Sequence, residues 1–317
     1  MIRDVIVSIG RVGTLAVLRF LQSSPEITPT SWFDLPTVRR HWAALDHASR
    51  RFLIMVHHSS EVSILNSASS QVKVTWNTRC PFASARSSVN WRIFQDIILH
   101  DGQPSKHWTE MVNEDDLCGF YPNIVETLHD HDLLIIDVSE LSATTPLGYE
   151  KIARHHGISM SQMEVPYGIQ SGDFETFLFS YRFVLNGISY MIMPAKGITW
   201  LRKDMHVGSI DGSEVFPEYY KPGRVLSVYA EMDRPDSEWK KEFSWDNFMK
   251  KKREISEPAY ACFGRYKKVF SEYELKQDNP QLEGMVNHAF GYRIGHFVNQ
   301  VPVFQKHWNT GKISAHP

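Results

Sequence analysis

The chain has 317 residues, with 34 Lys and Arg, 36 Asp and Glu, and a net charge of −2. This length allows two domains, and the balanced charge argues against a dedicated nucleic-acid binder, which normally carries a strongly basic domain. The three cysteines, Cys80, Cys118 and Cys262, form no CxxC pair. We therefore expect no zinc site, no disulfide framework and a reducing, cytoplasmic location. The apolar run Val5–Gly10 is too short and too closely flanked by charges for a signal peptide or a membrane span.

The first half of the chain alternates short apolar runs with helical patterns. Strands are predicted at Asp4–Ser8, Phe52–Val56, Val72–Trp76 and Leu133–Asp137, and helices at Thr14–Ser23, Leu35–Arg50, Ala83–Leu99 and Leu147–His156. Strands separated by helices predict an α/β fold with a parallel sheet and crossover connections. We expect residues 1–160 to form this core, with a soft boundary near residues 159–172.

The second half has a different pattern. Residues 176–185 alternate, with Phe177, Phe179, Tyr181 and Phe183 on one face, and Asn186-Gly187 leads into a second apolar run. Two such runs around Asn-Gly predict a β-hairpin over 176–193. Further elements are predicted as a strand at Val225–Ala230 and helices at Trp239–Arg253 and Pro280–Gln300. Residues 161–317 are thus expected to be an α+β region, whose aromatic stripe is either sheet core or, where exposed, an acceptor or dimer surface.

A candidate phosphate-binding loop, Ser8–Leu15, lies between the first predicted strand and the first predicted helix. Gly10 and Gly13 let the backbone curl, and amides at the start of a helix favour an anion. Arg11 would add a bidentate positive charge. The alternative is a plain tight turn. The loop is neither a G-x-x-x-x-G-K-[ST] nor a G-x-G-x-x-G motif.

The run from Ser8 to Ile27, with Arg11-x-Gly13-Thr14 and Ser24-Pro25-Glu26-Ile27, resembles the start of the sulfotransferase family. In that family the loop binds the 5′-phosphosulfate of 3′-phosphoadenosine 5′-phosphosulfate (PAPS). The resemblance implies that Arg11, Gly13, Thr14 and Leu15 bind this donor. Gly10, Val12 and Leu15 depart from the family's usual proline, serine and threonine or serine.

A second similarity lies at Arg79-Cys80-Pro81 and Ser87, which resemble the family's R-[DN]-P-x5-S element. The resemblance implies that Arg79 and Ser87 hold the 3′-phosphate of the donor. The alternative for these two residues is a surface ion pair and an ordinary helix serine. A softer similarity runs from Leu133–Leu141 to His156-Gly157-Ile158 and concerns the scaffold alone.

Two adjacent histidines, His57 and His58, follow the second predicted strand. Sulfuryl transfer needs a base near neutral pKa to take the proton of the acceptor, and histidine suits that role. Because neighbouring residues on a strand point to opposite faces, we expect one of the pair to face the cleft, with His58 preferred. Glu61 is an alternative base, and a histidine that merely caps the strand end is the structural alternative.

The other polar runs have structural explanations. His129-Asp130-His131-Asp132 is expected to be a solvated turn rather than a metal site, and no metal is expected anywhere. His155 and His156 close a predicted helix, where a cation meets the negative end of the helix dipole. Lys250-Lys251-Lys252-Arg253 is expected to be a solvated helix face, with an anion-binding role as the alternative.

These features together predict a PAPS-dependent sulfotransferase that acts on a hydroxyl or amine of a carbohydrate or small metabolite. Residues 1–160 would bind the donor, and residues 161–317 would bind the acceptor or form a homodimer. Neither a nucleic-acid partner nor a membrane span is expected. Two alternatives stay open: a group transferase with another activated nucleotide donor, and a non-catalytic binding protein on the same scaffold.

Overall fold

The computed structural model describes residues 4–10, 12–28, 51–67, 72–118, 121–141, 146–163, 165, 181–194, 206–220, 222–223, 225–230 and 243–294. The chain divides into two compact units. Unit 1 comprises residues 1–89, 112–169 and 275–317, and unit 2 comprises residues 90–111 and 170–274. The predicted division into residues 1–160 and 161–317 stays a prediction.

Unit 1 is built on a five-stranded sheet in the order β2-β3-β1-β4-β5. The strands are β1 (Asp4–Val7), β2 (Ile27–Thr28), β3 (Arg51–Val56), β4 (Lys73–Thr78) and β5 (Asp132–Asp137). Every neighbouring pair is parallel. The predicted parallel sheet is confirmed, and the carboxyl ends of all its strands lie at one edge.

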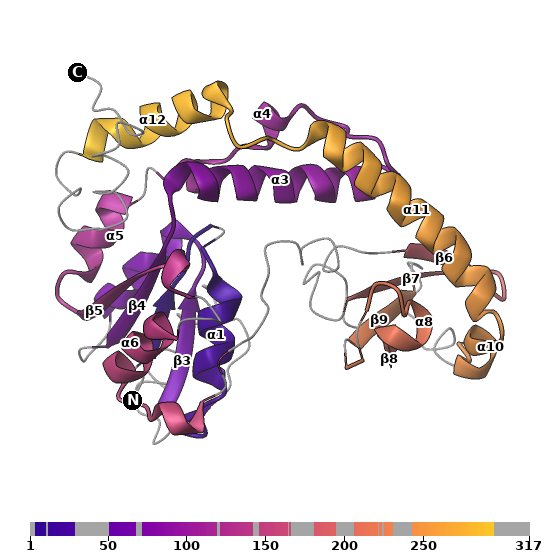
Figure 1. Cartoon of the computed structure of the whole chain (residues 1–317), viewed down its shortest axis with the longest axis horizontal. Coiled ribbons are helices and arrows are strands. Elements are labelled where there is room, and N and C mark those ends of the chain that lie inside the picture. The colour runs from indigo at the N-terminus through magenta and orange to yellow at the C-terminus, as the bar shows by residue number, and fades with distance from the viewer. Residues whose placement is uncertain are drawn as a thin grey trace. The chain divides into compact units, whose positions relative to one another are not determined.

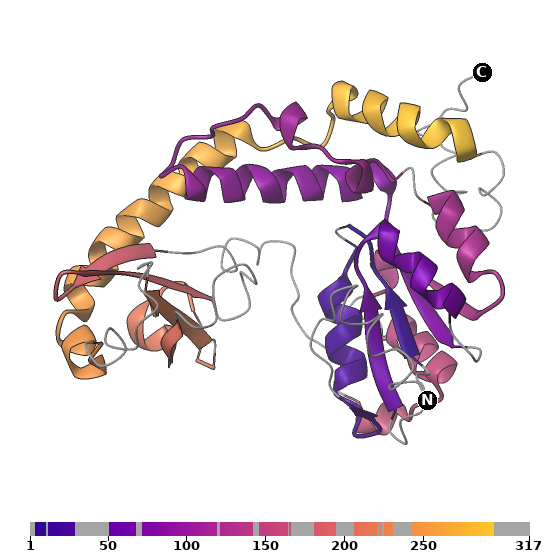
Figure 2. The ribbon, with the colours of Figure 1, turned by 180° about the vertical axis from the view of Figure 1, so that it is seen from behind.

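Helical segments cover both faces of this sheet (Figures 1 and 2). The helices α1 (Thr14–Gln22) and α6 (Leu147–His156) pack on one face with the core around Ile6. The helix α5 (Tyr121–Leu128) and the 3-10 helix η1 (Ser59–Ser67) pack on the other face with the core around Val7. Coverage on both sides explains why β1 is an unbroken apolar run after Asp4, since every residue of the strand is buried.

The other helices of unit 1 are η2 (Glu114–Leu117), η3 (Val138–Glu140), η4 (Met160–Gln162) and α12 (Pro280–Ile294). The helix α3 (Pro81–Leu99) begins in unit 1, and α4 (Trp108–Met111) belongs to unit 2. Proline at the first position of α3 is favourable, because its missing N–H would have had no partner in the helix. The division between the units falls inside α3, after Val89, and α12 contacts η2 in unit 1.

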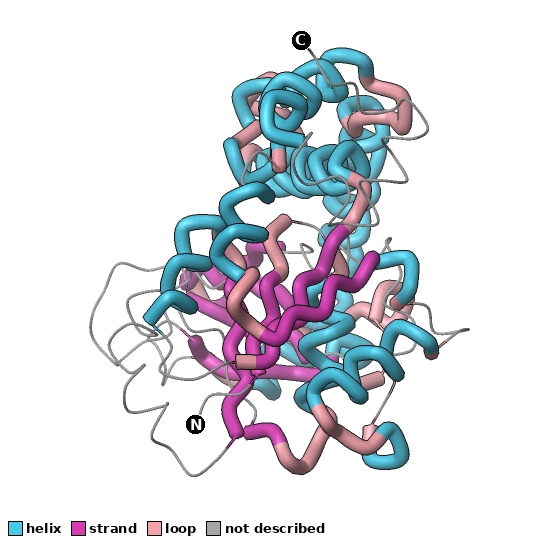
Figure 3. The backbone as a smooth tube through the Cα atoms, turned by 90° about the vertical axis from the view of Figure 1, so that its left-hand side faces the viewer, coloured by secondary structure: helices cyan, strands magenta, loops and turns pink. Residues whose placement is uncertain are grey.

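Unit 2 contains an antiparallel sheet in the order β6-β7-β9-β8. Figure 3 distinguishes the described helices, strands and loops by colour. Its strands are β6 (Tyr181–Leu185), β7 (Ile188–Pro194), β8 (His206–Asp211) and β9 (Val225–Ala230). Asn186 and Gly187 both have positive φ, 53° and 80°, which is the geometry of a type I′ hairpin turn. The predicted hairpin is confirmed over the described residues 181–194, whereas Phe177 and Phe179 lie outside them.

An aromatic cluster forms one side of that sheet. Phe183 stacks on Tyr190 with ring centroids 5.6 Å apart, and Phe248 lies 5.5 Å from Phe183. In the described part of the predicted aromatic stripe, Phe183 is buried and belongs to the sheet core, whereas Tyr181 is half-buried. The helices of unit 2 after α4 are α8 (Gly212–Val215), α10 (Trp245–Lys250) and α11 (Lys252–Tyr273).

The helix predicted at Trp239–Arg253 differs from the structure. Two helices, α10 and α11, meet at Lys251, and α11 continues past Pro258 to Tyr273. Proline inside a helix usually ends or kinks it, yet Pro258 lies within α11. The predicted helix Leu35–Arg50 and residues 239–242 and 295–300 lie outside the described residues.

Candidate functional site

Three strand ends with polar residues meet at the carboxyl edge of the parallel sheet. β1 pairs with β3 on one side and with β4 on the other. The loop that begins at Ser8 therefore lies between the segments that follow β3 and β4. His57 and His58 follow β3, and Arg79 follows β4. The fold therefore brings the predicted loop, the predicted base and the predicted phosphate-binding arginine to one edge.

The loop between β1 and α1 depends on its two glycines. Gly10 and Gly13 have left-handed φ values of 78° and 76°. A Cβ atom on Gly13 would lie 2.8 Å from a methyl group of Val138, and one on Gly10 would lie 3.0 Å from the Ser84 hydroxyl. Gly13 is the N-cap of α1 and provides no side-chain cap, so amides at this helix start are available to an anion. Arg11 lies outside the described residues, as does the side chain of Leu15.

A buried chain of hydrogen bonds lies beneath this loop. The hydroxyl oxygens of Ser8 and Thr14 are 2.6 Å apart, and the Asn77 side-chain amide donates to Ser8 Oγ at 3.3 Å. All three side chains are buried, and the carbonyl oxygen of the Asn77 side chain has no partner among the described residues. Thr14, which the sequence indicated, is thus hydrogen-bonded to Ser8, the first residue of the predicted loop, and Ser8 in turn to Asn77. Sequence reasoning missed Asn77, because nothing in the sequence marked it.

Arg79 provides positive charge beside the loop. Burial and the nearby charge of Arg86 lower the pKa of Arg79, while Cys80 and Asp137 act in the opposite direction. Two arginines in one neighbourhood favour a bound anion, because each charge raises the local potential. Ser87 lies on α3, eight residues after Arg79, and is partly exposed.

The two histidines have different partners. His57 Nδ1 lies 3.0 Å from the backbone oxygen of Ser8, whereas His58 Nδ1 lies 3.6 Å from Oδ2 of Asp115. The rings form an edge-on pair with centroids 5.4 Å apart. His58 is the more open residue, with 63 % of its side chain exposed. Sequence reasoning missed Asp115, which is 57 positions away and carries no local signal.

Glu61, the alternative base, acts in the structure as a backbone cap. Its Oε2 accepts hydrogen bonds from the backbone N–H of His57 at 2.9 Å and of His58 at 3.1 Å. These bonds satisfy donors at the start of η1. The carboxylate of Glu61 therefore fixes the backbone that carries both histidines.

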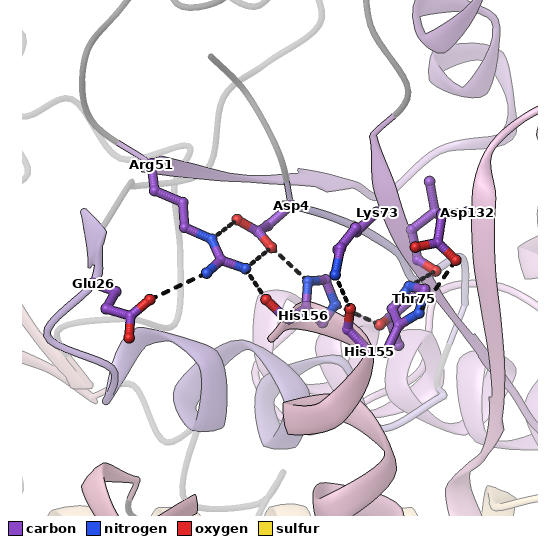
Figure 4. A network of polar contacts seen from close by, with 9 residues as sticks. Asp4, Glu26, Arg51, Lys73, Thr75, Asp132, His155 and His156 are labelled. Atoms are coloured by element: carbon purple, nitrogen blue, oxygen red, sulfur yellow. Dashed lines mark hydrogen bonds and ion pairs between the residues drawn. The ribbon is translucent and has the colours of Figure 1, made fainter. Parts of the chain in front are cut away.

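The opposite, amino edge of the sheet holds a second polar network (Figure 4). His156 Nδ1 lies 2.6 Å from Oδ1 of Asp4, and His156 Nε2 lies 2.7 Å from the Thr75 hydroxyl. Arg51 forms an ion pair with Asp4 and also donates to the backbone oxygen of His156. Asp4, Thr75 and His156 are all buried. Because the Thr75 hydroxyl is inaccessible, this Asp-His-Thr arrangement is structural rather than nucleophilic.

This network also explains the histidine pair at the end of α6. Lys73 donates to the backbone oxygen of His155 at 2.5 Å, so Lys73 and Arg51 both contact carbonyls in the last turn of the helix. Cations at a helix C-terminus are stabilising. Lys73 and Arg51, the first residues of β4 and β3, thus place cations at the helix end that the histidine pair closes. His129 and Asp130 form the turn before β5, and the described residues contain no group of three or more possible metal ligands.

Comparisons with known proteins give similarity at the level of structure. No family model and no curated protein matches the chain. Among the solved structures, mouse sulfotransferase SULT7A1, in a crystal structure with PAP, is similar with 19 % sequence identity and a TM-score of 0.37. The match covers 51 % of this chain, and this chain spans 60 % of the length of that one. None of the described helices is long and apolar enough to cross a membrane.

Proposed function

We propose that the chain is a PAPS-dependent sulfotransferase. The observation that carries this proposal is the order of the strand ends: the glycine loop after β1 has Arg79 on one side and the His57–His58 pair on the other. A donor with two anionic ends and a base for the acceptor would each find a matching group there. The resemblance of Arg11-x-Gly13-Thr14 and of Arg79 with Ser87 to the family motifs gives the donor its identity.

The described residues fit a phosphate-containing donor. The helix start at Gly13 offers amides, the close approach of the loop to Ser84 and Val138 leaves no room for larger side chains, and Arg79 with Arg86 provides positive charge. In this proposal Arg11, Gly13, Thr14 and Leu15 hold the phosphosulfate end. Arg79 and Ser87 hold the 3′-phosphate.

In the proposed reaction, the acceptor oxygen or nitrogen forms a bond to sulfur while the bond from sulfur to the bridging phosphate oxygen breaks. The electron pair of the broken bond stays on 3′-phosphoadenosine 5′-phosphate (PAP), and the acceptor proton passes to His58 or His57. Positive groups near the leaving phosphate stabilise the charge that develops there, and fixed positions reduce the entropic barrier. This transfer needs no metal.

Another activated nucleotide donor is the second candidate. Val12, fully buried, stands where the family usually has a serine, and the hydroxyl of Thr14 contacts Ser8. With both features, the backbone amides of the loop provide the main contacts to the anion, and such contacts are less selective for one donor. Residues 161–317 are proposed to bind the acceptor or a second copy of the chain.

The test is calorimetric titration with PAP, with adenosine 5′-phosphate as the control ligand. We expect PAP to bind and the 3′-phosphate to contribute at least tenfold in affinity, because a charge-assisted contact to arginine is strong. Arg79→Ala should remove that preference. Arg253→Ala, at an exposed arginine that pairs with Glu257, is the matched control and should bind PAP as the wild type does.

Absence of PAP binding in the wild type would reject the sulfotransferase. Equal affinity for the two nucleotides would instead favour the second candidate. Binding without turnover on any hydroxyl or amine acceptor would favour a non-catalytic nucleotide-binding protein.

A further inference from the structure

We infer that Asp115 is a positioning residue for His58 and that these two side chains form the pair that receives the acceptor proton. This inference rests on the proposed function, and it selects His58 over His57. It also adds a residue from a distant part of the chain to the site.

The two side chains lie within ion-pair distance. Asp115 Oδ2 lies 3.6 Å from His58 Nδ1, and the Ser59 hydroxyl donates to the other oxygen, Oδ1, at 2.5 Å. The carboxylate is thus held by one neighbour of His58 while its second oxygen faces the ring. Only 25 % of the Asp115 side chain is exposed, compared with 63 % for His58, so the acid is the better sheltered partner.

The backbone on both sides of the contact is fixed by capping. Asn113 and Asp116 form a capping box at the start of η2, with hydrogen bonds of 3.1 and 2.8 Å. On the other side, Glu61 caps the backbone of His57 and His58. These caps occupy the carboxylates of Asp116 and Glu61, whereas the Oδ2 atom of Asp115 lies beside the His58 ring.

The Nδ1 atom of His57 faces a different kind of group. It lies against the backbone oxygen of Ser8, and a neutral carbonyl stabilises an imidazolium less than a carboxylate does. The charged or titratable groups that face His58 are Asp115, Glu61 and the His57 ring. Asp115 raises the pKa of His58, burial opposes this increase, and Glu61 adds to it.

The pairing assigns the proton positions. With Nδ1–H directed at Asp115, the lone pair of His58 lies on Nε2. As the acceptor oxygen bonds to sulfur, its proton moves to Nε2, and the sulfur–oxygen bond to PAP breaks. The imidazolium that forms is stabilised by the Asp115 carboxylate and returns its proton to water after the products leave.

The first experiment is an NMR pH titration of the full chain labelled with ¹³C at histidine Cε1. The His58 signal is identified by its loss in His58→Gln. We expect Asp115→Asn to lower the pKa of His58 by about one unit, while Asp115→Glu retains most of the wild-type value. Asp130→Asn is the matched control, because Asp130 contacts the exposed His129, and it should leave His58 unchanged.

The second experiment measures turnover with PAPS and a panel of phenols, alkyl alcohols and amines. Asp115→Asn should lower kcat about tenfold or more and move the acidic limb of the rate profile down with the pKa of His58, with PAP affinity unchanged. An unchanged His58 titration in Asp115→Asn overturns the inference. If the titration of His58 shifts but the rate profile does not, the contact with Asp115 is retained and its catalytic role is overturned. If the titration shifts but the wild type does not bind PAP, the catalytic role and the proposed function are both overturned.

Discussion

At the scale of single residues, the two loop glycines show how backbone geometry limits the sequence of the site. Gly13 has positive φ, and a Cβ atom there would also meet Val138. Gly187 in the hairpin has a φ of 80°, and no atom lies within 4 Å of the position that a Cβ would take. A side chain at either position would strain the backbone, and only at Gly13 would it also collide with a neighbouring residue.

We therefore expect Gly13→Ala to lower the free energy of unfolding by more than the roughly 1–2 kcal/mol that left-handed backbone alone costs an alanine. Gly187→Ala is the control and should lose only that backbone amount. Urea unfolding of both variants measures the difference. Equal losses would mean that the contact with Val138 relaxes without cost.

The hydroxyl of Thr14 gives a second test at this scale. Because Ser8 Oγ lies between Asn77 and Thr14, Ser8→Ala removes the hydrogen bonds on both sides and leaves the Asn77 amide buried without a partner. An unsatisfied buried polar group costs about 1–3 kcal/mol. We expect that loss in urea unfolding together with weaker PAP binding, and Ser63→Ala, at an exposed serine of η1, should change neither.

At the scale of the elements, charged side chains at the starts of β1, β3 and β4 contact the end of α6. Burial raises the pKa of Asp4, but hydrogen bonds and charges from Arg51 and His156 outweigh burial, and the net pKa is lowered. A lowered pKa in the folded state means that the carboxylate stabilises the fold above the unfolded pKa of about 3.9. That contribution is lost as the pH falls from about 4 through the lower folded pKa.

Thermal unfolding between about pH 2.5 and pH 7 tests this linkage. We expect Asp4→Asn to lower the free energy of unfolding by about 3–5 kcal/mol near neutral pH, because Arg51 loses its partner in a largely buried pair. Below about pH 4, the stability of this variant should fall less steeply with decreasing pH than that of the wild type. Asp130→Asn, at an exposed acid, should show the same loss of stability at acidic pH as the wild type. If Asp4→Asn and the wild type lose stability equally steeply at acidic pH, Asp4 does not carry this pH dependence.

The elements also show what the sequence could and could not predict. The apolar runs in Asp4–Ser8 and Phe52–Val56 correctly indicated the buried strands β1 and β3, and Asn186-Gly187 correctly indicated the hairpin. β8 was missed because Gly208 interrupts its alternation and a bulge lies between His206 and Gly208. α5 was missed because its buried face contains Tyr121, Ile124 and Leu128, a short stripe within only eight residues.

The candidate site was predictable only where it follows a strand. His57, His58 and Arg79 could be indicated because each follows an apolar run, and parallel strands share an edge. Asn77 and Asp115 act through contacts with residues 69 and 57 positions away. No local pattern encodes such contacts, because they depend on how η2 packs and on the register between β1 and β4.

At the scale of the whole molecule, the two units have separate cores, one around the parallel sheet and one around Phe248 in unit 2. We expect calorimetry to show two unfolding transitions, since each unit can bury its own apolar surface. PAP at about 100 times its dissociation constant should stabilise the unit 1 transition alone, by about 2.7 kcal/mol. Phe248→Ala should lower the other transition alone, and one merged transition in every variant would contradict this independence.

The long separation of Asp4 from its partner has a consequence for synthesis of the chain. Asp4 is fully buried and meets His156, which is 152 positions later. At about 5–20 residues per second, a ribosome needs on the order of 8–30 s to add that stretch. Until then Asp4 lacks its His156 partner, so we expect β1 to reach its full protection only after α6 has emerged. Limited proteolysis of chains truncated before Leu147 and after Gly157 tests this: equal protection of β1 in both would rule it out.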